Sequence, residues 1–274
     1  MNLTPDIIAS LAKSEHQHKY DHGHALVLSG GMGKGGAARL AARGALRVGA
    51  GLVTVGCPPS ALLEHATQLT AIMCRPVADA SALTDMLKDH RFNALCIGPG
   101  LGLGDDAQSL VAAVLESRRA TVLDADALTL LSGDRALVAM LHQGCILTPH
   151  GGEFARLFPD TDLADREAAT RAAAASAGCT VLLKGAETVI ATPGGATITR
   201  QARGAEAAPW LATAGSGDVL AGIITGLLAR GLSVQDAAAT GVWLHAEAAR
   251  VFGPGLIAED LPDALPLVFR KIGL

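Results

Sequence analysis

Short runs of apolar residues alternate along the chain with longer stretches in which apolar positions recur every three to four residues. The short runs predict buried β-strands at Ala25–Ser29, Gly51–Gly56, Ala94–Gly98, Ala120–Asp124, Cys145–Thr148 and Thr180–Lys184. The longer stretches predict helices at Gly36–Val48, Asp79–His90, Asp105–Arg118 and Asp162–Ser176. Alternation of this kind is typical of a parallel sheet that is covered by helices on both faces.

The pattern changes after the last of these strands. Two β-branched segments, 188–192 and 196–199, flank Pro193–Gly195 and predict an antiparallel hairpin at one edge of the sheet. After Trp210 we expect helix for most of the remaining chain. No linker-like or repeated segment divides the sequence, so we predict one α/β domain over 1–274, a three-layer fold with a mostly parallel sheet between helices and an antiparallel edge hairpin.

Composition narrows the function classes. Half of the 274 residues are apolar, which is enough for a core and argues against disorder. Only 3% are aromatic, which argues against a nucleic-acid platform on which bases stack. The net charge of −4 also lacks the basic footprint of a nucleic-acid partner. We therefore expect a protein that binds small molecules rather than nucleic acid.

Neither a signal peptide nor a membrane helix is expected. Residues 1–6 carry no basic head before an apolar run, and the apolar stretch Val219–Leu228 is far shorter than the ~20 residues that span a bilayer. The five cysteines never form a Cys-x-x-Cys pair, and several lie inside apolar runs, so we expect buried free thiols. These features predict a cytoplasmic protein without a membrane partner.

Two glycine-rich loops follow predicted strands. Ligands of such sheets bind beyond the carboxyl ends of the strands, where helices begin. Gly30–Gly36 follows the first strand, and Pro99–Gly104 follows the third. The first loop is not a Walker A loop, because Gly35 stands after Lys34 where a hydroxyl residue is needed. A tight turn and an anion cradle both remain open, and the density of glycine favours the cradle.

Charged residues follow three further strands. Asp124 and Asp126 suit magnesium or polar ligand groups, although Asp126 alone more readily caps the next helix. His150 is expected at the rim of the sheet, and Glu153 is either a ligand residue or a first-turn carboxylate. Lys184 ends an apolar strand, where it requires a phosphate or a carboxylate as partner.

The sharpest signal is Gly215-Ser216-Gly217-Asp218, directly before an uncharged helix that must be buried. The backbone N–H groups of Gly215–Gly217 offer an anion site at that helix start. Asp218 either compensates the helix dipole or acts as a general base beside a phosphoryl group. We favour the general base, because an uncharged, buried helix offers little reason for a carboxylate that only compensates the helix dipole.

Four histidines near the N-terminus, His16, His18, His22 and His24, are spaced as pairs that suggest metal. No cysteine or carboxylate cluster accompanies them at a zinc-binding spacing. We therefore expect solvated loop histidines.

The Gly-Ser-Gly-Asp motif, with Lys-Gly at the end of an earlier strand, resembles the ribokinase-like superfamily. Six motifs together resemble the NAD(P)H-hydrate dehydratases within it, and they occur in that family's order: 36–55, Ile97–Gly102, Leu123–Leu128, Leu147–Glu153, Leu183–Thr188 and Gly215–Gly222. The sequence departs from the family's pattern at three positions. Gly151 stands where the family often has Pro, and Ser216 stands where it often has Thr. Lys34 lies in a loop that we expected to be more neutral.

The resemblance implies a ribokinase-like fold and a lyase that converts hydrated NADH or NADPH back to NADH or NADPH. ADP, or ATP in its place, would supply the phosphoryl group, with Mg²⁺ offsetting phosphate charge. The implied nucleotide-binding residues are Lys184, Gly185, Ala186, Glu187, Thr188, Gly215, Ser216 and Gly217. The implied residues at the hydrated cofactor are Ala37, Gly100, Gly102, His150 and Asp218, with Asp218 catalytic.

No metal ligands follow from the resemblance, and it implies a homotetramer. Two alternatives stay open. One is an ATP-dependent small-molecule kinase of the same superfamily, such as a vitamin-precursor kinase, which would leave a stable phosphorylated product. The other is a non-catalytic nucleotide sensor, which would bind ADP without turnover.

Overall fold

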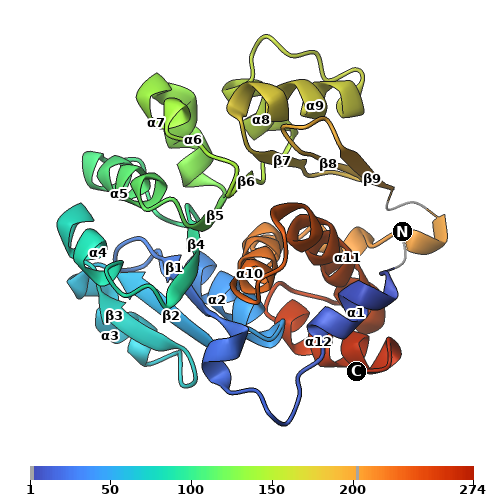
Figure 1. Ribbon diagram of the computed structural model, residues 1–274, viewed down its shortest axis with the longest axis horizontal. Helices are drawn as coiled ribbons and strands as arrows, with labels where there is room; N and C mark the ends of the chain where they lie inside the picture. The colour runs from blue at the N-terminus through green and yellow to red at the C-terminus, as the bar shows by residue number, and fades with distance from the viewer. Residues whose placement is uncertain (1–2, 202–203) are drawn as a thin grey trace.

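A single sheet organises the protein (Figure 1). The computed structural model describes residues 3–201 and 204–274, so the first two residues of the N-terminal stretch considered above lie outside it. The strands of the described residues are β1 (His24–Leu28), β2 (Leu52–Cys57), β3 (Met73–Pro76), β4 (Phe92–Ile97), β5 (Ala120–Leu123), β6 (Cys145–Leu147), β7 (Thr180–Leu183), β8 (Glu187–Ala191) and β9 (Thr197–Gln201). Their order is β3-β2-β1-β4-β5-β6-β7-β8-β9.

Strands β1 to β7 are parallel, and β8 and β9 are antiparallel at one edge. The predicted mixed sheet and its edge hairpin are therefore confirmed. Each predicted strand is present within one or two residues of its expected bounds, because strands buried on both faces carry continuous apolar runs. In β1, for example, Ala25 and Val27 face one core while Leu26 and Leu28 face the other.

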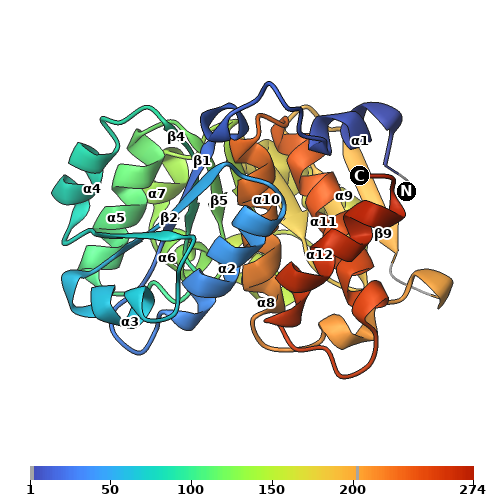
Figure 2. The ribbon, with the colours of Figure 1, turned by 90° about the horizontal axis from the view of Figure 1, so that it is seen from below.

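Helices cover both faces of the sheet (Figures 1 and 2). One layer holds α2 (Gly36–Arg47), α10 (Ser216–Ala229), α11 (Val234–Phe252) and α12 (Asp260–Lys271). The other holds α4 (Ala80–Met86), α5 (Asp105–Glu116), α6 (Asp126–Gly133), α7 (Arg135–Ala139), α8 (Gly151–Leu157) and α9 (Arg166–Ala177). Short helices complete the chain: α1 (Pro5–Leu11), α3 (Leu62–Ala66) and single 3₁₀ turns at Lys19–His22, Pro59–Ala61, Gly204–Glu206 and Pro209–Leu211.

Helices α2 and α10 pack backbone against backbone. A Cβ atom on Gly222 would lie 1.9 Å from the carbonyl oxygen of Ala41, and one on Gly226 would lie 2.5 Å from that of Ala45. Both helices begin at the carboxyl edge of the sheet, after β1 and after the Gly215 turn. Their close approach therefore sets the relative position of the two loops that precede them.

We expect Gly222→Ala to destabilise the fold. Its new methyl group meets the backbone of α2 rather than a flexible side chain, so one helix must move, at a cost of about 3 kcal/mol. The matched control is Gly151→Ala at the start of α8, where the space around the new Cβ is open. Urea unfolding of both variants measures the difference, and equal midpoints would contradict the close packing.

The structure corrects several predicted boundaries. The sequence pattern does not predict strand β3, because this edge strand is largely exposed and lacks an apolar run. The helix expected over Asp162–Ser176 begins at Arg166, since the Asp165 side chain caps it by accepting the Ala168 N–H. The helix expected over Asp79–His90 ends at Met86. Short polar turns next to these helices extend the apparent periodicity.

Two of the four N-terminal histidines are not solvated, which corrects the prediction for His22 and His24. Each is only 7% exposed. His24 is the first residue of β1, and its Nε2 lies 2.8 Å from Thr54 Oγ1. Burial lowers the pKa of His24 to about 4, so the ring is neutral at pH 7. His16 and His18 are exposed as expected.

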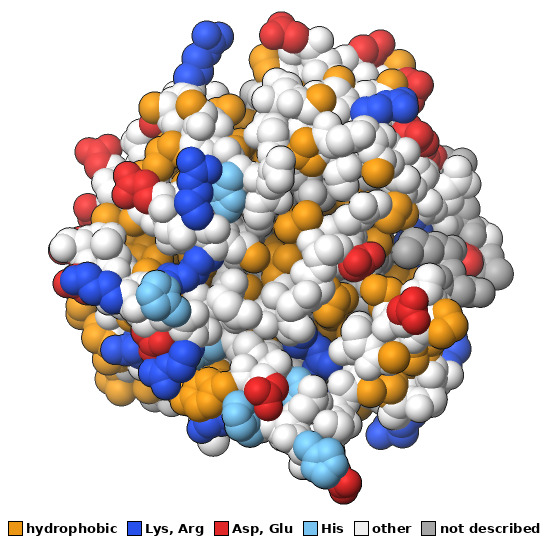
Figure 3. Space-filling view, viewed as in Figure 1, with side chains coloured by type: hydrophobic (Ala, Val, Ile, Leu, Met, Phe, Trp, Pro, Cys, Tyr) orange, Lys and Arg blue, Asp and Glu red, His pale blue; other side chains and the backbone are white. Residues whose placement is uncertain are grey.

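The cysteine side chains are free thiols, as the sequence predicts. All five cysteines are free, four are buried, and burial raises the pKa of Cys57 to about 11. Within 3–201 and 204–274, no helix combines the length and apolarity that crossing a membrane requires. The face shown in Figure 3 carries acidic and basic side chains interspersed with apolar ones.

Candidate active site

An ion pair lies where β5 and β7 end. Lys184 follows β7, and its Nζ donates to Asp124 Oδ1, 2.7 Å away, at the end of β5. Thr148 Oγ1 donates to the same oxygen at 2.8 Å. Asp124 is 2% exposed, and Glu153 Oε2 lies 4.0 Å from the lysine. The partner that the sequence required for Lys184 is therefore a buried carboxylate.

The Gly215 turn brings the start of α10 to this ion pair. Gly215 has φ +85°, and a Cβ there would lie 2.6 Å from Leu40 Cδ1, so the turn needs glycine. A Cβ on Gly217 would lie 3.4 Å from Lys184 Nζ and 4.0 Å from Asp124 Oδ2. The first N–H groups of a buried helix therefore face a lysine ammonium, an arrangement that suits a phosphate group.

Asp218 lies in the first turn of α10, partly buried. Burial, assisted by the negative charges of Asp124 and Asp126, raises the pKa of Asp218 to about 6, against the opposing effect of Lys184. A carboxylate whose pKa lies this close to neutrality accepts a proton efficiently while still being ionised at pH 7. The strength of this carboxylate is therefore compatible with the general-base role that the sequence suggests.

Asp126 does not cap α6, which corrects the favoured interpretation of that residue. The N-cap position is Ala125, with φ +50°, and Asp126 is the first residue of the helix. Its Oδ2 accepts the Gly102 N–H at 2.8 Å. Asp126 therefore connects the second glycine-rich loop to the carboxylates around Asp218. In that loop Gly104 is the N-cap of α5.

The two glycine-rich loops pack directly on each other. A Cβ on Gly30 would lie 1.9 Å from the Gly100 carbonyl oxygen, and one on Gly100 would lie 2.6 Å from that of Lys34 and 3.6 Å from Ala37 Cβ. Lys34 Nζ would lie 3.8 Å from a Cβ on Gly102. Ala37, Gly100 and Gly102, which the family resemblance assigns to one ligand, are thus brought together beside a lysine.

Glu64 holds the first glycine-rich loop in place. Its Oε2 accepts the Gly33 N–H at 2.7 Å, while its Oε1 accepts from Arg39 at 2.9 Å. The next residue, His65, lies 3.0 Å from Ser29 Oγ at the end of β1. The pattern of apolar residues gave no sign of these contacts, because Glu64 lies on a short helix far away in the sequence.

His150 lies exposed at the rim, as expected, and it also has a local structural role. Its Nδ1 accepts the N–H groups of Gly152 and Glu153 at 3.0 and 3.3 Å. The Glu153 carboxylate in turn accepts the His150 N–H at 2.8 Å, so the two residues form a capping box at the start of α8. Nε2 of His150 lies 3.6 Å from Glu153 Oε1.

A cavity of about 660 Å³ opens beside the ion pair. Its polar end includes Lys184 and Gly217, and its apolar wall includes Leu211, Leu220 and Val242. Of the predicted nucleotide residues, six line it: Lys184, Gly185, Ala186, Thr188, Ser216 and Gly217. Glu187 and Gly215 do not line it. The Glu187 side chain is directed to Gln201 on β9, because alternate residues of a strand face opposite sides.

A buried histidine that the sequence did not single out supports the start of α10. His245 of α11 donates from Nε2 to the Ser216 carbonyl oxygen at 2.9 Å and lies 3.1 Å from Ser216 Oγ. Burial lowers the pKa of His245 to about 4, so it is a neutral donor. The Ser216 hydroxyl group therefore has a hydrogen-bonding partner inside the protein, the His245 ring.

Arg166 holds the loop that carries Lys184. Its Nε donates to the Glu187 carbonyl oxygen at 3.1 Å, and its Nη2 donates to that of Lys184 at 3.1 Å. The sequence gave no sign of this role, because an arginine in the first turn of a helix looks like an ordinary surface residue. The arrangement makes Arg166 a positioning residue for the cavity.

If this cavity holds the nucleotide that the family resemblance implies, Arg166→Met should weaken its binding about tenfold, since losing charge-assisted bonds to the loop costs roughly 1.5 kcal/mol. The KM for the nucleotide should rise while kcat changes little, because Asp218 is untouched. Arg171→Met on the same helix is the control, since Arg171 is exposed. An unchanged KM would show that the loop keeps its shape without Arg166.

No group of three or more His, Cys, Asp or Glu side chains within the described residues is arranged to hold a metal ion. A magnesium ion here would therefore depend on ligand phosphates for most of its coordination, as Mg²⁺ commonly does. The nearest acidic groups to Lys184 are Asp124 and Glu153. Their oxygen donors suit this hard cation.

Comparison with known proteins places these motifs in context. The model of a family described as NAD(P)H-hydrate dehydratase matches residues 25–265. An ADP-dependent (S)-NAD(P)H-hydrate dehydratase from Neisseria meningitidis is 39% identical, with 95% of this chain and 90% of the relative covered. A bifunctional NAD(P)H-hydrate repair enzyme from Gloeobacter violaceus is 40% identical over 90% of this chain. The chain spans about half the length (49%) of that relative.

Solved structures show the same architecture. An ADP/ATP-dependent NAD(P)H-hydrate dehydratase from Bacillus subtilis, co-crystallised with ATP and Mg²⁺, superimposes with a TM-score of 0.79 at 28% identity, over 97% of this chain and 95% of that one. A ribokinase-like superfamily protein from Enterococcus faecalis gives a TM-score of 0.84 at 25% identity, over 98% and 95% of the two chains. The fold is therefore ribokinase-like, as the motifs predicted.

Proposed function

The chain belongs to the NAD(P)H-hydrate dehydratase family, and from that premise we propose that it restores NADH and NADPH from their (6S)-hydrated forms with ADP as phosphoryl donor. The products are the dihydronicotinamide nucleotide, AMP and phosphate. The observation that carries the proposal is Asp218, whose pKa of about 6 suits a general base beside the helix start and Lys184.

The chemistry begins with a poor leaving group. The hydroxyl of the hydrated ring attacks the terminal phosphorus of ADP, the bond from that phosphorus to the bridging oxygen breaks, and AMP leaves. Asp218 accepts the hydroxyl proton in this step. The ring carbon–oxygen bond then breaks with release of phosphate, and loss of a proton from the neighbouring carbon restores the double bond.

Lys184 and the N–H groups of Gly215–Gly217 stabilise the charge that develops on the transferred group. We place ADP in the cavity of about 660 Å³, with its base against the apolar wall and its phosphates toward Lys184. Gly185, Ala186, Thr188 and Ser216 line that cavity. Glu187 and Gly215 do not line the cavity. We propose that they shape it indirectly, Glu187 as part of β8 and Gly215 through the turn before α10.

We place the hydrated nucleotide on the other side of Asp218, on the paired glycine-rich loops. Ala37, Gly100 and Gly102 meet there, and Lys34 offers its phosphates a cation. Asp126 links these loops to Asp218 through the Gly102 N–H and through its charge. His150 lines the cavity in which we place ADP, and we propose that it contacts the hydrated nucleotide from that side.

Magnesium is proposed as the partner of the ADP phosphates. When bound, Mg²⁺ would offset phosphate charge and polarise the transferred group. Asp124 and Glu153 are the acidic residues that would hold it, directly or through water, because their oxygen atoms lie at the end of the cavity where Lys184 would bind the phosphates. The relative co-crystallised with ATP and Mg²⁺ supports this proposal and leaves ADP and ATP to be compared by experiment.

The test follows phosphorus through the reaction by ³¹P NMR, with hydrated NADH, Mg²⁺ and either ADP or ATP. The proposal predicts AMP and inorganic phosphate from ADP in equal amounts. A stable phosphorylated substrate would instead show the small-molecule kinase that shares this fold. Tight ADP binding with no new phosphorus signal would show a nucleotide sensor, and either result would overturn the dehydratase.

Three further properties complete the proposal. Residues 1–274 are proposed to act as one ribokinase-like domain. The family resemblance supports a homotetramer, which sedimentation velocity tests directly. The five free cysteines favour the reducing cytoplasm, where the NADH and NADPH pools lie.

A further inference from the structure

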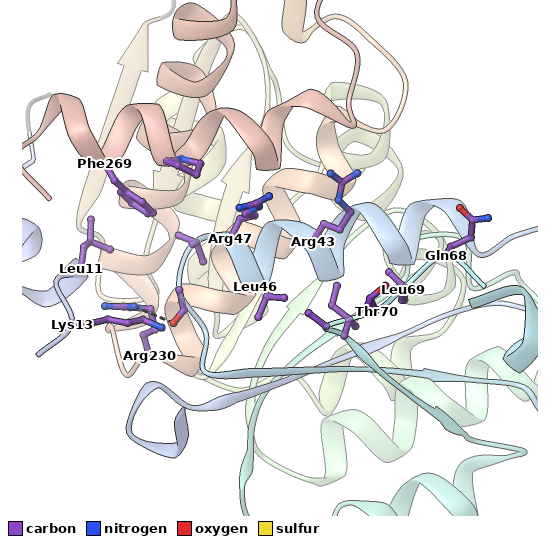
Figure 4. A pocket seen from close by; sticks show the side chains of 15 residues that line it. Leu11, Lys13, Arg43, Leu46, Arg47, Gln68, Leu69, Thr70, Arg230 and Phe269 are labelled. Carbon is purple, nitrogen blue, oxygen red and sulfur yellow. Dashed lines mark hydrogen bonds between the residues drawn. The ribbon is translucent and has the colours of Figure 1, made fainter. Parts of the chain in front are cut away.

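A second cavity, of about 680 Å³, lies at the far ends of the two helices that begin at the active site (Figure 4). It is bounded by the end of α1, the C-terminal part of α2, the 68–72 segment before β3, Arg230 after α10, and α12. None of its lining residues belongs to the site described above. Leu11, Leu46, Leu69, Ile72 and Phe269 make its wall largely apolar.

Four basic side chains line this apolar cavity: Lys13, Arg43, Arg47 and Arg230. Asp263 of α12 accepts from both Arg43 and Arg47, at 2.7 and 2.8 Å. Lys13 and Arg230 have no carboxylate partner in the described part of the chain. Figure 4 shows these two side by side, away from the Arg43 and Arg47 groups.

Arg230 is partly buried and incompletely bonded. Its Nη1 donates to the Gly49 carbonyl oxygen at 3.1 Å, and its Nη2 donates to that of Ser10 at 2.8 Å. Its Nε is buried without a hydrogen-bond partner. Nη2 also donates to the Ala12 carbonyl oxygen at 3.2 Å, so only backbone carbonyl groups face this positive charge, and an anion beside the guanidinium would lower the free energy of the protein.

Lys13 adds a second positive charge to the same place. Its Cε would lie 3.4 Å from a Cβ on Gly49, the residue that Arg230 bonds. Partial burial and the charge of Arg230 lower the pKa of Lys13, an exposed side chain. Burial is also the main cause that lowers the pKa of His22, and the charges of Lys13 and Arg230 add to it, against the opposing charge of Asp21. The basic groups therefore repel one another where an anion would attract them all.

We propose that this cavity binds a small anionic ligand with a hydrocarbon body. The anionic group, a carboxylate or a phosphate, lies between Lys13 and Arg230, and the body lies against Leu46, Ile72 and Phe269. The cavity volume is within the range of small-molecule sites, which are mostly apolar with a few placed polar groups. The site is separate from ADP and from the hydrated substrate, so it does not rest on the proposed function.

Octanoate is the probe, and isothermal titration calorimetry on the full chain measures its binding, both without ADP and with ADP added. Octanoate should bind, octylammonium should not, and inorganic phosphate alone should bind more weakly than octyl phosphate. Octyl phosphate against octanoate tells which anionic group is preferred. Lys13→Met should weaken octanoate binding about tenfold, because it removes one charged hydrogen bond. Lys88→Met, whose lysine pairs with Asp85 on α4, is the control.

Lys13→Met should keep the wild-type melting temperature or exceed it, because the substitution relieves repulsion with Arg230. Equal binding of octylammonium, or unchanged octanoate binding by Lys13→Met, would overturn the proposal. So would absence of octanoate binding together with a change in sedimentation of Lys13→Met, since the cavity would then be a contact between subunits. Competition between octanoate and ADP would place the probe in the active site and would also overturn the proposal.

Discussion

Asp218→Asn is expected to lower kcat about 10³-fold while ADP still binds, because the variant loses the proton acceptor and keeps the helix start and Lys184. In the wild-type protein, kcat/KM should fall tenfold per pH unit below about 6, where Asp218 becomes protonated. Asp124→Asn should move this acid limb to lower pH, since the Asp124 charge raises the pKa of Asp218. Wild-type turnover by Asp218→Asn would remove Asp218 from the mechanism.

The same variant should be more stable than the wild type. The folded-state pKa of Asp218, about 6, lies above its ordinary value of 3.8, so the folded protein holds this proton more tightly than the unfolded chain. The contribution of this protonated group to the free energy of unfolding is fully present below pH 3.8 and is lost as the pH rises through 6. At pH 7, Asp218→Asn should therefore gain up to about 3 kcal/mol, and this gain should vanish near pH 4.

Lys184→Met is expected to cause the largest loss of stability at the site. Its removal leaves the Asp124 carboxylate buried without a counter-charge, which costs about 3–5 kcal/mol. ADP affinity should also fall about 10- to 100-fold, because a charged hydrogen bond to phosphate is lost. Thermal unfolding and calorimetric ADP titration measure the two effects separately.

The double variant Lys184→Met/Asp124→Asn distinguishes the two roles of the lysine. Neutralising Asp124 removes the uncompensated charge, so most of the stability should return. ADP affinity should stay low, because the ammonium group is still absent. If ADP affinity returned together with stability, Lys184 would serve the fold alone, and the proposed phosphate contact would be wrong.

The sheet was predictable because its central strands are buried on both faces, which leaves continuous apolar runs such as that of β4. The edge strand β3 left no such run, since its residues are largely exposed. Strand order follows less directly from the sequence, but parallel strands bring their carboxyl ends to one edge. For that reason Asp124 and Lys184, which follow two of these strands, lie together at that edge, where the Gly215 turn also meets them.

The supporting residues were not predictable, because they act through the backbone of distant segments. Arg166 donates to carbonyl groups of the loop after β7, and His245 donates to the carbonyl of Ser216. Neither contact leaves a periodic pattern. Asp126 was also misjudged from the sequence. Its position at the start of a helix favoured a capping role, whereas its carboxylate accepts a hydrogen bond from the Gly102 N–H of a distant loop.

The central claim is that the chain itself converts hydrated NADH to NADH at the expense of ADP. The measurement is the near-ultraviolet absorbance of the dihydronicotinamide ring after purified protein, ADP and Mg²⁺ are added to chemically hydrated NADH. The account predicts that absorbance rises in proportion to the ADP consumed, and that Asp218→Asn gives no rise. Consumption of ADP without recovery of absorbance, or no reaction with either ADP or ATP, would contradict it.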